Sequence, residues 1–135
     1  MRKYGVYITP VVLAIVVGAI GCLGDDSGPE YRISWASADS VEVLSVSPLT
    51  VQFDVSGSKP TPCHEIIEPV ITEDTKNRQV TVRMRSRVAT DVVCVTVIGS
   101  YEKTIDVRVS TSGVWDFVFP DGLGGETTVP AVTLP

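Results

Sequence analysis

Alternation of apolar and polar residues limits the fold of this 135-residue chain more than any other feature of its sequence. Every second residue is apolar in the segments 49–56, 80–85, 104–109 and 114–119. Successive side chains of a β-strand point to opposite faces of a sheet. Each segment therefore predicts a strand with one face against a core and the other face in water.

Further segments predict strands of particular kinds. The segment 65–72 contains Pro69, which cannot donate to a ladder and so predicts an edge strand or a bulge. The segment 91–98 carries apolar residues on both faces, which favours a central strand covered on both sides. Residues 31–35 predict either a first edge strand or a loose arm near a membrane interface. Residues 127–133 predict either a last edge strand or part of a disordered tail.

These segments and a further one at 41–46 are spaced roughly every 8–12 residues, and no helical period follows the start of the chain. The spacing predicts an all-β fold, a single antiparallel β-sandwich of about seven strands after an N-terminal hydrophobic signal or anchor helix. We expect the sandwich at 41–120 and a flexible tail or short edge strand at 121–135. A signal peptide at 1–21 and a polar tether at 22–40 are expected before it.

The start of the chain has the arrangement of a secretory signal. Arg2 and Lys3 precede an uncharged stretch that is rich in Val, Ile, Leu and Ala and continues to Gly24. A helix of about 20 apolar residues also spans a bilayer, so this stretch predicts either a cleaved signal peptide or an uncleaved anchor. Both alternatives place the acidic remainder of the chain outside the cytoplasm.

A cysteine lies near the end of this stretch. The segment Ala19-Ile20-Gly21-Cys22 resembles the lipobox of bacterial lipoproteins. The resemblance implies cleavage before Cys22 and attachment of two or three acyl chains to it, which hold a protein stably on a membrane. We then expect a membrane-anchored protein on the extracytoplasmic face of the cell envelope, periplasmic or at the surface. In the alternatives, Cys22 is an ordinary residue of an uncleaved anchor, or the chain is secreted.

The other two cysteines are Cys63 and Cys94. If Cys22 carries lipid, they remain as a pair in an oxidising compartment, and we expect a disulfide between them. An alternative takes Cys63, His64 and Glu65 as metal ligands. Neighbouring residues of a strand point to opposite faces, and the chain has a single histidine, so we expect no metal site.

The cysteine positions also carry a resemblance. Pro62 and Cys63 adjoin, Cys94 lies in a later hydrophobic segment, and an aromatic alternating segment with Trp115 closes the pattern. Over residues 41–119 this resembles the uncharacterised immunoglobulin-like domains of bacterial lipoproteins. The resemblance implies an immunoglobulin-like sandwich. Trp115 follows both cysteines, whereas the tryptophan of antibody domains lies between them.

Charge and motifs exclude several classes of function. The formal net charge is −5, and the chain from residue 22 onward has nine cations against 16 acids, which disfavours binding to nucleic acid or to anionic lipid in general. We find no phosphate loop, no nucleophilic serine motif and only one histidine. We therefore expect no catalytic residues and no cofactor.

One cluster of cations is locally unusual. Arg83, Arg85 and Arg87 share strand parity and should lie on one face. The functional interpretation is a docking stripe for an acidic partner, a glycan or envelope phosphate groups. The alternative is a solvated face whose arginines pair with acids of neighbouring strands.

The expected function is binding. The chain is interpreted as a non-catalytic interaction module or an accessory subunit of the envelope, with an unidentified envelope protein or glycan as partner. Two alternatives are an immunoglobulin-like protease inhibitor, acting through loops at 57–62 and 121–125, and a purely structural spacer with an uncleaved anchor.

Overall fold

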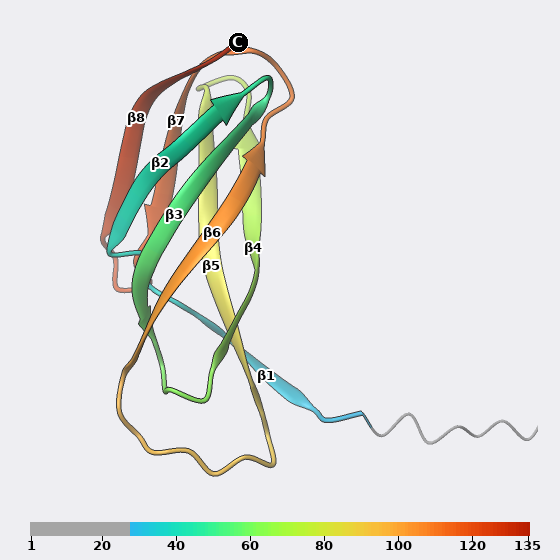
Figure 1. Ribbon diagram of the computed structural model, residues 1–135, viewed down its shortest axis with the longest axis vertical. Helices are drawn as coiled ribbons and strands as arrows, with labels where there is room; N and C mark the ends of the chain where they lie inside the picture. The colour runs from blue at the N-terminus through green and yellow to red at the C-terminus, as the bar shows by residue number, and fades with distance from the viewer. Residues whose placement is uncertain (1–27) are drawn as a thin grey trace, which may run out of the picture.

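The computed structural model describes residues 28–135, and these residues form eight strands in two sheets (Figure 1). The all-β sandwich is confirmed, with eight strands where about seven were predicted. No helix within the described range is long and apolar enough to cross a membrane. The predicted signal peptide and Cys22 lie outside the described residues. The strands are β1 (Tyr31–Trp35), β2 (Ser40–Ser47), β3 (Thr50–Lys59), β4 (Glu65–Asp74), β5 (Gln79–Ala89), β6 (Gly99–Arg108), β7 (Gly113–Pro120) and β8 (Glu126–Leu134).

The smaller sheet has the order β2-β3-β6. Strand β3 pairs along its whole length with β6, from Thr50 opposite Arg108 to Lys59 opposite Gly99. Its other edge forms a hairpin with β2. The alternation predicted for 49–56 and 104–109 is confirmed, because the apolar side chains of this set are buried: Val51, Phe53, Val55, Ile105, Val107 and Val109.

The larger sheet is built around β5. Strand β4 covers one edge of β5. The other edge is shared by two strands, β7 opposite Gln79 to Thr81 and β1 opposite Arg85 to Ala89. The expected sheet was wholly antiparallel, but β7 runs parallel to β5. The reason is that the chain leaves β6 at the end of the sandwich where β5 begins, so it enters β7 in the same direction.

The aromatic segment at 114–119 supplies the centre of the core, as its alternation predicts. The ring of Phe53 on the smaller sheet lies 4.9 Å from that of Phe117 and 5.2 Å from that of Phe119. Trp115 is fully buried, and its Nε1 donates a hydrogen bond to the Thr111 carbonyl at 3.0 Å. Aromatic rings, each of which buries a large apolar surface, therefore form the centre of the contact between the two sheets, and aliphatic side chains complete the core.

The chain passes from one sheet to the other directly after β1. The Ala36 amide still donates to Met84 of the larger sheet, whereas the Asp39 amide donates to Ser56 of the smaller sheet. A Cβ on Gly57 would meet the Ser37 carbonyl oxygen at 2.1 Å, so only glycine fits beneath this crossing. The sandwich thus extends beyond the predicted 41–120. Residues 31–35 form the edge strand β1, and the tail forms β8.

The predicted central strand at 91–98 is wrong. These residues form a loop between β5 and β6, and Val93 and Val95 are 99% and 65% exposed. Both edges of β5 are already occupied by β4 and by β1 with β7, so no position beside β5 is left for this segment. The prediction for Pro69 is confirmed, because β4 is an edge strand with a register shift between Ile67 and Val70.

Candidate binding surface

The three arginines of the predicted stripe lie on the outer face of the larger sheet. Between them along β5, Met84 and Ser86 are buried and point into the sandwich. Arg83, Arg85 and Arg87 therefore point outward, as their parity predicts.

Strand β1 adds aromatic side chains to the same face. Its register places Ile33 opposite Arg87 and Trp35 opposite Arg85. Paired residues share a face, so Tyr31, Ile33 and Trp35 all lie beside the arginines. They are 44%, 52% and 47% exposed. We call these six residues, Tyr31, Ile33, Trp35, Arg83, Arg85 and Arg87, the arginine–aromatic face.

Two of the three guanidinium groups of this face stack on its rings. The Cζ atom of Arg83 lies 4.5 Å from the ring centre of Trp35, and that of Arg87 lies 4.4 Å from the ring centre of Tyr31. Both distances are within the range of cation–π attraction. The stacks restrict the side chains of Arg83 and Arg87 on the outer face of the sheet.

Pairing with acids accounts for one of the three arginines. Arg87 Nε lies 3.0 Å from Glu65 Oε2, and this is the one ion pair in the part of the chain that the structure describes. Arg85 Nε donates to the Glu68 carbonyl oxygen at 2.9 Å. The alternative that neighbouring acids neutralise the stripe thus holds for Arg87 only, and the face retains a positive charge.

The opposite outer face of the sandwich is acidic. The registers of β2, β3 and β6 place Glu42, Asp54, Glu102 and Asp106 on the outer side of the smaller sheet, with Arg108 beside them. A hydrogen bond with Asp54, and then the charge of that carboxylate, raise the pKa of Glu102 above its usual range. The positive face is therefore local on a protein that is acidic elsewhere.

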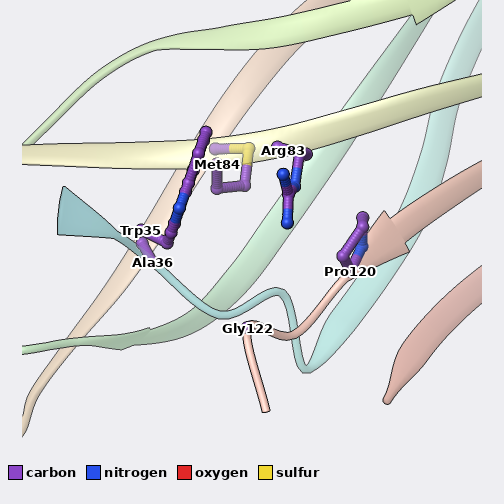
Figure 2. A pocket seen from close by; sticks show the side chains of 6 residues that line it. All are labelled: Trp35, Ala36, Arg83, Met84, Pro120 and Gly122. Carbon is purple, nitrogen blue, oxygen red and sulfur yellow. The ribbon is translucent and has the colours of Figure 1, made fainter. Parts of the chain in front are cut away.

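A small crevice opens at the margin of the arginine–aromatic face (Figure 2). It lies along the edge of β5 between the segment that pairs with β7 and the segment that pairs with β1. Its volume is about 10 Å³, enough for about one water molecule. The lining residues are Trp35, Ala36, Arg83, Met84, Pro120 and Gly122. This crevice is too small for a ligand, and the larger hollow that Trp35 also borders is open to solvent. The face is therefore a broad surface, which favours a macromolecular partner.

The residues of the alternative metal site have other partners. Cys63 and Cys94 form a disulfide with a Cα–Cα distance of 6.0 Å, which confirms the predicted pair. His64 is buried, and its Nδ1 is hydrogen-bonded to the Thr61 hydroxyl at 2.7 Å. Glu65 binds Arg87. Within residues 28–135 no three potential ligands gather around one point.

The surroundings of His64 disfavour the charged form of its imidazole. Burial lowers the pKa of His64 below 6.5, and the nearby cations Lys59 and Arg32 lower it further. The hydrogen bond between Nδ1 and the Thr61 hydroxyl fixes the ring against the connection between β3 and β4. The histidine is thus a structural part of the β3–β4 connection.

The two loops of the inhibitor alternative differ in structure. In the loop at 57–62, the first three residues belong to β3. In the loop at 121–125, Asp121 Oδ1 accepts hydrogen bonds from the amides of Leu123 and Gly125 at 2.7 and 2.9 Å. The second loop is held by its own carboxylate and presents Leu123, which is 93% exposed.

Sequence reasoning found the arginines but not the aromatic half of the face. Tyr31 and Trp35 are about fifty residues away from their partners on β5 along the chain. Parity identifies which side chains share a face of one strand, but it does not identify the neighbouring strand. The sequence signal for the aromatic half is that Tyr31, Ile33 and Trp35 alternate with Arg32 and Ser34, which places the three apolar side chains on one face of a strand.

Two packed sheets around an aromatic core define a β-sandwich domain. The family model of the ORF11 beta-sandwich domain matches residues 53–130, which is more than half of the chain, and the chain belongs to this family. Comparison with curated proteins and with solved structures finds no match.

Proposed function

We propose that the chain is a lipoprotein, anchored through Cys22 on the extracytoplasmic face of a membrane, that binds an acidic partner through its arginine–aromatic face. The partner presents carboxylate or phosphate groups on an envelope protein or glycan. The module performs no chemistry of its own on that partner.

The observation that carries the proposal is the stacking of Arg83 on Trp35 and of Arg87 on Tyr31. A guanidinium group binds carboxylate or phosphate through two parallel hydrogen bonds, and stacking fixes its orientation before the partner arrives. Less conformational entropy is then lost on binding. Exposed rings beside the cations add apolar contact of the kind that is enriched at binding hot spots.

The proposed location of the protein outside the cytoplasm is supported by one feature of the sequence and one of the fold. The segment Ala19 to Cys22 resembles a lipobox. The disulfide between Cys63 and Cys94 belongs to an oxidising compartment such as the periplasm or the cell surface. Both features favour an anchored protein outside the cytoplasm.

Charge-neutral variants test the face directly. Alginate (a polyuronate) and poly-L-glutamate serve as probes, with binding measured by surface plasmon resonance at low and at moderate salt. The double variant Arg83→Gln/Arg85→Gln should bind at least about tenfold more weakly, because each charge-assisted hydrogen bond contributes about 1.5–3 kcal/mol. The matched control is Lys76→Gln/Arg108→Gln, which removes the same charge from exposed positions outside the face.

Equal loss in both double variants would contradict the proposal, because net charge and not the face would then determine binding. Failure of the wild-type protein to bind either polymer would contradict it as well. Unfolding midpoints of all variants show whether any loss comes from folding.

A further inference from the structure

A second surface of the molecule is apolar and uncovered. In the β5–β6 loop, Val93, Val95, Val97 and Ile98 are 99%, 65%, 56% and 77% exposed. Leu123 at the tip of the β7–β8 loop is 93% exposed. Exposed aliphatic residues in such a group mark a contact with a partner or a membrane. We call these five residues the apolar end.

The two loops of the apolar end lie together and are held in place. Ile98 and Leu123 line the same open hollow of about 210 Å³, together with Trp35. The β5–β6 loop is fixed covalently to the connection between β3 and β4 through Cys94 and Cys63. The apolar side chains are therefore presented by restrained loops.

The N-terminal segment joins the sandwich at this same end. Thr90, at the start of the β5–β6 loop, donates hydrogen bonds to the Glu30 carbonyl through its amide at 2.9 Å and through its hydroxyl at 3.3 Å. Figure 1 shows the loop at the end of the sandwich opposite the β2–β3 turn. Glu30 is eight residues after Cys22, a reach of at most about 29 Å when extended. A lipid on Cys22 would therefore lie within that distance of Glu30.

We propose that the apolar end rests in the surface of the membrane to which the chain is anchored, with its aliphatic side chains at the boundary between headgroups and acyl chains. This inference rests on the proposed anchoring. Residues 92–98 carry no charge and Asp91 is an acid, so apolar burial and not headgroup attraction holds the loop. The overall acidity of the protein agrees with a contact that does not depend on anionic lipid.

The contact also sets the orientation of the domain. Strand β1 begins beside Ala89 at the apolar end and continues toward Trp35. With the apolar end in the membrane, the arginine–aromatic face stands beside the bilayer and is open to partners that approach along the membrane surface.

Depth-dependent quenching tests the contact. The full-length protein carrying Val93→Trp is extracted from membranes and reconstituted into phosphatidylcholine vesicles with brominated acyl chains. The matched control is Val46→Trp, because Val46 is also exposed but lies near the β2–β3 turn, at the opposite end of the sandwich. Trp35 borders the hollow of the apolar end, so the quenching of each introduced ring is taken as the difference from the wild-type protein, whose tryptophans are Trp35 and Trp115.

The proposal predicts that the Trp introduced at position 93 loses emission beyond the wild-type background, because a ring at the boundary between headgroups and acyl chains is within reach of the brominated chains. The Trp of the control should not be quenched. Quenching should be equal in vesicles with and without phosphatidylglycerol. A vesicle-bound protein whose introduced ring is unquenched overturns the apolar contact but leaves the anchoring intact. A protein that does not float with the vesicles overturns both.

Two further outcomes would overturn the proposed apolar contact with the membrane, because each points to a different interaction of the loop. Protection of the introduced ring from aqueous acrylamide without quenching by brominated lipid means that protein covers the loop, either a second copy or another part of the chain. Quenching that requires phosphatidylglycerol means that headgroup attraction positions the domain.

Discussion

Removal of the disulfide should cost much of the stability of the domain. The bond joins residues with a sequence separation of 31, and it encloses β4 and β5. In the chain-entropy treatment, opening a loop of this length destabilises the folded state by about 3.7 kcal/mol at 25 °C. Cys63 is exposed and Cys94 half-buried, so the double variant Cys63→Ala/Cys94→Ala loses little packing. The loss of stability should therefore come mainly from the greater conformational entropy of the unfolded chain without the disulfide.

The assay is urea unfolding of the full-length protein in a nonionic detergent, followed by the fluorescence of the buried Trp115. With a slope of about 1.5–2 kcal/mol/M, the midpoint should fall by about 2 M in the double variant. Thr96→Ala, an exposed change in the same loop, is the control and should lie within about 0.5 kcal/mol of wild type. A loss below about 1 kcal/mol in the double variant would refute the reasoning, since the unfolded chain would not then gain the expected freedom.

Three further predictions concern single positions. Gly57→Ala should destabilise by about 2–4 kcal/mol in the same unfolding assay, because its Cβ would collide with the Ser37 carbonyl, and Gly28→Ala, which meets no atom within 4 Å, should change little. The lowered pKa of His64 means that the unfolded chain takes up a proton that the folded chain resists. Stability should therefore be complete above about pH 6.5 and should decline as the pH falls toward the native pKa, and His64→Gln should remove this slope between pH 5 and 7. Glu65→Gln should cost less than about 1 kcal/mol, because its ion pair with an arginine is exposed. A larger loss would show that the pair organises the surface.

The alternating strands were predictable because one physical rule governs them. Phe53, Val82, Val107 and Phe117 each lie in a segment of period two, and each is fully buried. The disulfide followed from the cysteine count and the expected compartment. These features depend on local sequence or simple arithmetic, and the structure confirms them.

The pairing of the strands and the loop at 91–98 were not predictable in the same way. A run such as the one around Val93 and Val95 looks the same in sequence whether neighbours cover it or leave it exposed. The decisive fact is that β4 occupies one edge of β5 and that β1 and β7 share the other, and this depends on residues far away in the sequence. The direction of β7 likewise depends on which end of the sandwich the chain crosses.

The segment 91–98, where the predicted strand was wrong, is also the segment that suggests a contact. A segment with the composition of a buried strand remains exposed at the end where the anchor segment joins the domain. Local rules tend to be broken where function requires it. The membrane proposed above would supply the covering that no strand supplies.

The measurement that tests the central claim most directly is the intact mass of the protein extracted from membranes. The account predicts the mass of residues 22–135, increased by the acyl groups on Cys22 and decreased by the two hydrogens lost in the Cys63–Cys94 disulfide. The unmodified mass of all 135 residues would contradict lipid anchoring at Cys22.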